Sequence, residues 1–211
     1  MNIYFLLLLV MILLLYEGII SSLFYAPKKI KIISTMALIL MTFRYIALII
    51  LFITKNQSYL YLLKPAVFTN LLCIPVCGIL SIFIFARNNK IKLKKILVIC
   101  AMMSIAYCIV IYKFPANINI SNLCGYIIEL EREIYCYIVF VIINSIFAII
   151  GLRLFNKTYS NKLGAALIIM SSSITLIAVL LTSINTSFVW LLLGDISWIV
   201  TLNYGLTKLK R

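Results

Sequence analysis

The sequence predicts an all-α integral membrane protein, a single transmembrane domain over residues 1–211 built as a bundle of seven transmembrane helices. Hydrophobic residues make up 65% of the chain and charged residues only 11%, which is more apolar surface than one soluble core can bury. The apolar residues fall in segments of about 20 residues, the length that a helix needs to cross a bilayer. Short basic clusters separate these segments, as in membrane proteins whose cytoplasmic loops carry Lys and Arg.

The apolar segments are expected to span the membrane in the order in which they occur. They cover about residues 2–24, 32–54, 66–86, 96–113, 135–154, 163–182 and 187–205.

Three details refine these spans. The first segment lacks the basic start and the small-residue cleavage site of a signal peptide, so we expect it to be retained. Pro75 in the third segment removes one backbone donor and predicts a kink. Two connections leave room for other boundaries: residues 55–65 could extend either neighbouring span, and residues 182–187 must form a very tight turn.

The distribution of Lys and Arg predicts the orientation. Most of these residues lie in the loops after the first, third and fifth spans and in the C-terminal tail, whereas the opposite face carries only Lys55, Lys64, Lys113 and Arg132. Because basic loops stay in the cytoplasm, we expect the N-terminus outside and the C-terminus in the cytoplasm of a plasma-membrane, multi-pass protein. The net charge of +14 is explained in this way, so the expected partner is the lipid bilayer and no nucleic acid is expected.

The longest polar connection follows Pro115 and has the opposite sign of charge. Its sequence, ANINISNLCGYIIELERE, contains three glutamates and one arginine. Cys124 and Cys136 lie in or beside it and could form a disulfide in an oxidising compartment.

Three ionisable residues lie inside the predicted spans: Glu17, Arg44 and Asp195. With a rise of 1.5 Å per residue, Arg44 lies roughly 15 Å and Asp195 roughly 12 Å from the outer ends of their spans, whereas Glu17 lies roughly 22 Å deep. A charge at such depth faces the bundle interior and has a partner. The preferred pair is therefore Arg44 with Asp195, and Glu17 is a second candidate partner of Arg44.

Such a pair has two interpretations. It is either a structural ion pair that fixes the packing of the second and seventh spans, or part of a polar pocket that opens to the outside. The second interpretation depends on Tyr107, Asn144 and Thr175, which lie at the same depth in other spans. Each of these alone is typical of an interhelical hydrogen bond.

Catalytic chemistry is not expected. The chain has no histidine, which removes the commonest general base and a favoured metal ligand. Its single aspartate cannot form the pair that an intramembrane aspartyl protease requires. The sequence therefore predicts no enzyme, no metal site and no cofactor.

Asp195, Ile196 and Ser197 lie near the middle of the seventh span and are followed by Trp198. Together with seven spans and an outside N-terminus, this resembles the seven-helix sensor region found ahead of bacterial histidine kinases, whose last helix often begins with an Asp-Leu-Thr-Pro-like element. Trp198 stands where that family favours proline. The resemblance implies a sensor of an external ligand, and because no output module follows in this sequence, we expect a separate cytoplasmic or membrane signalling partner.

Three functions therefore remain open. The leading one is a sensor or receptor-like module with an outer-half pocket near Arg44 and Asp195. The alternatives are a small transporter or permease subunit, in which Glu17, Arg44 and Asp195 line a path, and an accessory or immunity-type membrane protein that works through helix contacts. A polar route through both halves of the bundle favours transport, and a dry inner half favours the receptor.

Overall fold

The computed structural model describes residues 3–54, 60–86, 93–121, 124–185 and 189–209. The longer helices are α1 (Ile3–Tyr25), α2 (Lys28–Ile53), α4 (Asn70–Ala86), α5 (Leu93–Lys113), α6 (Glu133–Phe155), α7 (Lys162–Asn185) and α8 (Val189–Thr207). The shorter elements are a 3-10 helix, η1 (Leu60–Leu63), the one-turn helix α3 (Lys64–Val67) and the strands β1 (Ala116–Ser121) and β2 (Gly125–Leu130).

Seven helical segments of the described residues are long and apolar enough to cross a membrane, which confirms the predicted bundle of seven apolar spans. The third of these runs from Leu60 to Ala86 and so includes η1, α3 and α4. Residues 60–63 thus extend the third span, whereas residues 55–59 of the ambiguous connection lie outside the described residues.

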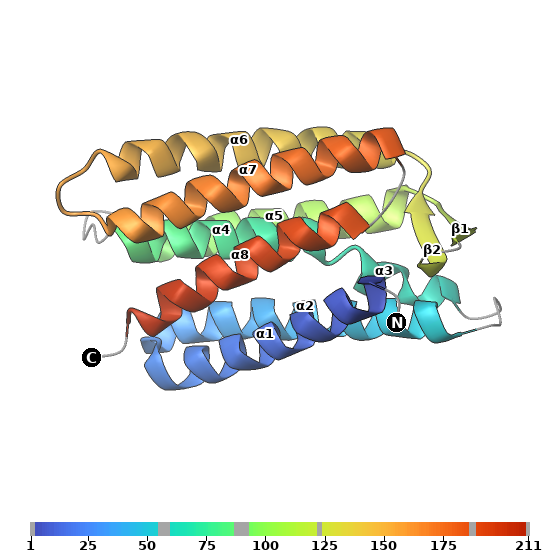
Figure 1. The fold of residues 1–211 in the computed structure, drawn as a ribbon, viewed down its shortest axis with the longest axis horizontal. Coiled ribbons are helices and arrows are strands. Elements are labelled where there is room, and N and C mark those ends of the chain that lie inside the picture. The colour runs from blue at the N-terminus through green and yellow to red at the C-terminus, as the bar shows by residue number, and fades with distance from the viewer. Residues whose placement is uncertain (1–2, 55–59, 87–92, 122–123, 186–188, 210–211) are drawn as a thin grey trace.

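The bundle is arranged around α4 and α8. α8 crosses the molecule with α1 along one side and α7 along the other, and it also packs against α4 (Figure 1). Of the seven spans found among the described residues, the third, Leu60–Ala86, which contains α4, is the most buried, and the fourth, Ile96–Lys113 of α5, is the least buried. The N-terminal and C-terminal ends of the chain lie at opposite ends of the bundle, as an odd number of spans requires (Figure 1).

The third span contains a break that sequence periodicity does not reveal. Its helical hydrogen bonding is interrupted at Phe68 and Thr69, where the amide of Leu71 donates to the carbonyl of Phe68 (3.1 Å). In a continuous α-helix that amide would bond to the carbonyl of Val67. The break therefore leaves the Val67 carbonyl available for another donor.

A β-hairpin replaces the irregular loop expected after Pro115. β1 and β2 pair antiparallel, from Ala116 opposite Leu130 to Ser121 opposite Gly125. The expected all-α class is therefore incomplete, because alternating Asn and Ile in β1 and the apolar β2 favour strand pairing. The hairpin lies at the same end of the bundle as the N-terminus (Figure 1), and Ile128 and Leu130 pack in a cluster with Leu51 of α2.

Candidate functional site

Arg44 of α2 and Asp195 of α8 form the ion pair that their matched depth predicts. Nη1 of Arg44 lies 2.5 Å from Oδ2 of Asp195, and both residues are buried, at 5% and 2% exposure. In a medium of low dielectric constant the attraction between such charges is strong, but each charge also loses its hydration. Further hydrogen bonds are therefore needed around the pair.

Two neighbours supply these hydrogen bonds. The hydroxyl of Tyr45 donates to Oδ2 of Asp195 (2.9 Å), and Nε of Arg44 donates to the carbonyl of Val67 (2.8 Å). The second bond exists because the helix break leaves that carbonyl free of an intrahelical partner. The carboxylate thus accepts two bonds, and the guanidinium is fixed between α8 and the broken third span.

A cavity of about 40 Å³ lies beside Arg44. Its lining combines Arg44 with Tyr4 of α1, Asn70 of α4 and residues of β2 and α6, including Glu133 and Tyr137. Such a volume admits a few water molecules or a very small ligand. The cavity is therefore lined by β2 and by side chains of α1, α2, α3, α4, α6 and α8, with a few polar groups among mainly apolar ones.

Asn70 gives this cavity an unused acceptor. The residue is buried, at 6% exposure, and its Oδ1 atom has no hydrogen-bond partner among the described residues. Glu133, another residue of the lining, accepts a bond from the hydroxyl of Tyr137 (2.6 Å). A buried acceptor without a donor is costly, so Asn70 marks where a bound donor would be stabilised.

The second candidate partner of Arg44 lies elsewhere. Glu17 is exposed on α1 and makes no hydrogen bond or ion pair with the residues that the structure describes. Depth in the first span therefore does not identify the partner of Glu17, because its side chain points away from the bundle. Of the two carboxylates predicted as partners, Arg44 therefore pairs with Asp195 and not with Glu17.

The three candidate pocket residues do not line the cavity beside Arg44. Asn144 is buried, donates to the carbonyl of Phe140 (2.8 Å) and accepts a bond from the indole of Trp198 (3.1 Å). Thr175 donates to the carbonyl of Ser171 within α7 (2.7 Å). Tyr107 donates to the carbonyl of Pro65 and lines an apolar groove between α5 and α6. Although the sequence predicts that these three residues lie at the same depth as the ion pair, their side chains therefore contact other groups than Arg44 and Asp195.

The cysteines do not form a bridge or a metal site among the described residues. All six are free thiols, and Cys124 and Cys136 are both buried. No cluster of three or more His, Cys, Asp or Glu side chains comes together in the part of the chain that the structure describes.

Fold and site together define the class of the protein: it is a polytopic membrane protein with an ion pair buried between α2 and α8, in the half of the bundle that carries the hairpin. Neither a scan against protein-family models nor a search of curated proteins found a match for this chain.

Proposed function

We propose that the protein is a receptor-like sensor of a bacterial-type plasma membrane. A small external ligand binds in the cavity beside Arg44, and binding is transmitted through α8 to a separate signalling partner. The N-terminal end of the bundle, which carries the cavity and the hairpin, faces outside in this proposal.

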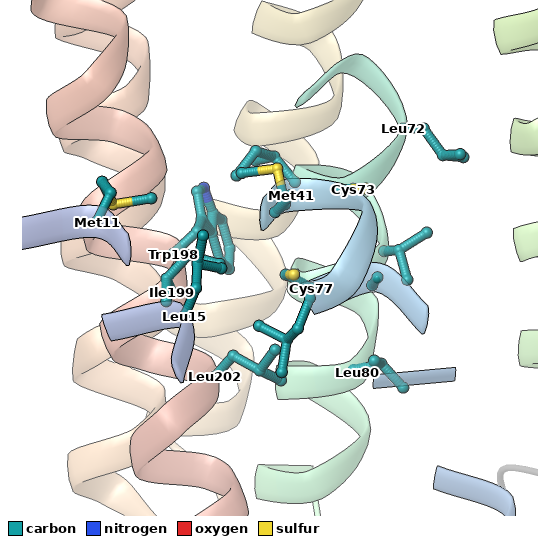
Figure 2. Close-up of a cluster of buried hydrophobic side chains, with 14 of the residues drawn as sticks. Met11, Leu15, Met41, Leu72, Cys73, Cys77, Leu80, Trp198, Ile199 and Leu202 are labelled. Atoms are coloured by element: carbon teal, nitrogen blue, oxygen red, sulfur yellow. The ribbon is translucent and has the colours of Figure 1, made fainter. Parts of the chain in front are cut away.

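The observation that supports this function best is the contrast between the cavity and the layer beneath it. One to three helical turns farther from the hairpin than Tyr4, Arg44, Asn70 and Asp195, side chains of α1, α2, α4 and α8 meet in a buried apolar cluster (Figure 2). Its members include Met11, Leu15, Met41, Cys77, Leu80, Trp198, Ile199 and Leu202, all exposed by 1% or less. None of these residues lines the cavity beside Arg44, so the cavity ends above this layer.

The route of the signal follows from the contacts of Asp195. A ligand that competes for Arg44 or for Tyr45 weakens their bonds to Asp195, which are the polar connections between α2 and α8 at this level. α8 also packs against α1, α4 and α7, so a change in its position alters several contacts at once. The ligand thereby shifts the population between two packings of α8.

The transporter is the weaker proposal because its path would have to cross the apolar layer. Polar groups do occur farther from the hairpin, and several are used in local contacts: the hydroxyls of Ser22 and Ser34 lie 2.5 Å apart, and Asn203 donates to the carbonyl of Leu14 (2.9 Å). Oγ of Ser81 and Oδ1 of Asn203 are buried without a hydrogen-bond partner among the described residues, but unlike Asn70 neither residue lines the cavity beside Arg44. An accessory or immunity-type role requires no cavity at all, so the unused acceptor on Asn70 favours the receptor over it.

Cysteine accessibility tests the proposal. In a background without the native cysteines, Asn70→Cys places a thiol in the cavity lining, and Ser81→Cys places one in a fully buried position deeper in the same helix. We expect silver ions, which are small enough for this cavity and bind thiols, to react with position 70 from outside only, and with position 81 from neither side. Labelling of position 81 from both sides would instead support a transport path, and labelling of position 70 only from the cytoplasm would refute the receptor.

A further inference from the structure

Glu17 is a carboxylate on the perimeter of the bundle, on the face of α1 turned away from the other helices, near the middle of a membrane-spanning helix. It lies roughly 21 Å from the first residue of α1 and roughly 12 Å from the last, along the helix axis. Its side chain is exposed, and so are Leu13 and Ile20, one turn before and one turn after it. The residue therefore faces the lipid acyl chains when the protein is alone in a bilayer.

Hydrocarbon is a poor environment for this group. Ionisable side chains within spans almost always face a protein neighbour or a water-filled cavity, because the charge otherwise loses its hydration without compensation. Glu17 makes no hydrogen bond or ion pair with the described residues. A glutamate is also too short to reach the interface from this depth, in contrast to a lysine or arginine near a helix end.

The surface around Glu17 has the geometry of a helix-packing seam. Its exposed residues follow one another at alternating steps of three and four: Ile3, Leu6, Val10, Leu13, Glu17, Ile20 and Phe24. This spacing keeps the residues on one stripe that another helix can follow at a shallow crossing angle. A single polar residue in an apolar stripe fixes the register and the choice of partner.

From these observations we infer that this stripe of α1 is a docking surface for a transmembrane helix of another protein, one that carries Lys or Arg near its middle. A cation at that position would neutralise the charge of Glu17 and donate hydrogen bonds to its carboxylate. The inference stands apart from the ligand cavity, since Glu17 lies outside the lining of that cavity.

A second copy of this chain does not offer a free Lys or Arg near the middle of a described span. Among the described residues, the basic group nearest the middle of a span is Arg44, which is buried and already paired with Asp195. Lys28 and Lys31 lie in the first turn of α2, at the end of the bundle. Two copies facing each other through α1 would bring two carboxylates together, and like charges disfavour that contact.

The test uses the full chain in liposomes with two synthetic probe helices. One is an oligoleucine span with a single arginine at its centre, and the other has leucine at that position. Association is measured by energy transfer between a labelled probe and a label on the C-terminus of the protein. We expect the arginine probe to associate roughly tenfold more strongly than the leucine probe with the wild-type chain, and this preference to vanish in Glu17→Gln.

A matched variant separates the carboxylate from general changes in α1. In Leu13→Glu combined with Glu17→Gln, the carboxylate moves one turn along the same stripe, and the preference should return for a probe whose arginine is shifted by one turn. Equal association of both probes with the wild-type chain would overturn the inference. Self-association of the wild-type chain that is stronger than that of Glu17→Gln would also overturn it, because the occupant would then be a second copy.

Discussion

At the scale of single residues, replacing Asp195 alone should destabilise the protein more than replacing Asp195 and Arg44 together. Deleting one member leaves an uncompensated charge in a buried site, which costs about 3–5 kcal/mol, whereas apolar replacement of both members is often neutral or stabilising. Arg44→Met and Asp195→Leu should therefore each lower the free energy of unfolding by about 3–5 kcal/mol. Unfolding in mixed detergent micelles measures this quantity.

The triple variant Arg44→Met, Tyr45→Phe and Asp195→Leu is the control for these two. It also removes the Tyr45 hydroxyl, which would otherwise lose its acceptor. It should be more stable than either single variant, with a loss of at most about 1–3 kcal/mol because the Val67 carbonyl no longer has the Arg44 donor. If the single substitutions change stability as little as a surface ion pair, below about 1 kcal/mol, the pair is not buried in the way described. If the triple variant folds but loses a ligand response, the pair has a function beyond packing.

The same scale shows what the sequence could predict about the site. Counting residues from the end of each span gives depth, and depth was sufficient for Arg44 and Asp195. It was not sufficient for Glu17 or Thr175, because successive residues of a helix point 100° apart and the direction depends on how each helix is rotated in the bundle. Depth also places Asn70 somewhat nearer the outer surface than the pair, but its position in the cavity beside Arg44 and the free carbonyl of Val67 could not be predicted, since both depend on the helix break in the third span.

At the scale of elements, glycines set the distance between helices. A Cβ atom on Gly78 of α4 would overlap the ring of Phe147 in α6, and that ring is held edge-on against Trp198 with centroids 5.4 Å apart. The ring cannot move aside freely, so Gly78→Ala should lower the free energy of unfolding by about 1–3 kcal/mol, the usual cost of overpacking.

Gly194 of α8 provides the matched control. A Cβ atom there would lie 3.3–3.4 Å from atoms of Thr175, which small shifts can accommodate, and alanine favours the helix by up to about 1 kcal/mol. Gly194→Ala should therefore be neutral or slightly stabilising in the same unfolding measurement. Equal destabilisation by the two substitutions would show that close packing at Gly78 is not what distinguishes the sites.

The hairpin is attached to α2 through a glycine. Gly125 has φ of 72°, and a Cβ atom there would approach the carbonyl oxygen of Leu51 at 3.1 Å. Gly125→Val combines this contact with a backbone strain of roughly 1–3 kcal/mol, so it should lift the hairpin from the bundle. The lifted hairpin exposes Cys124, which is buried at 3% exposure.

Thiol labelling measures this opening. In a chain that keeps Cys124 as its sole cysteine, labelling by an impermeant maleimide should be roughly tenfold faster in Gly125→Val than in wild type. Burial also raises the pKa of the Cys124 thiol, so the wild-type rate should keep rising with pH beyond the range in which an exposed thiol is fully ionised. Ile120→Val, at an exposed position of β1, should leave the rate unchanged, and an unchanged rate in Gly125→Val would refute the attachment.

Sequence patterns predicted these elements unevenly. Long apolar segments identified all seven spans, because span length is imposed by the bilayer and not by the neighbours. The hairpin was missed because its strands are only six residues long and lie within a polar connection. The break at Phe68 and Thr69 was missed because apolar composition continues through it.

At the scale of the whole molecule, the ligand proposal requires the hairpin end of the bundle to lie outside. The distribution of Lys and Arg predicts this orientation. The N- and C-terminal ends lie at opposite ends of the bundle, which agrees with an odd number of membrane spans (Figure 1). The hairpin and the C-terminus must then lie on different sides of the membrane.

Reporter fusions test that orientation directly. Alkaline phosphatase inserted between β1 and β2 should be active, since it folds only outside the cytoplasm, and the same enzyme after Arg211 should be inactive. A fluorescent protein that matures in the cytoplasm should give the reverse pattern at the two sites. Replacing Lys28, Lys29 and Lys31 by Gln should weaken the contrast, because these residues contribute to the positive charge that holds the first loop inside. A reversed pattern in the unmodified chain would place the cavity beside Arg44 on the cytoplasmic side, and an external ligand could not then reach it.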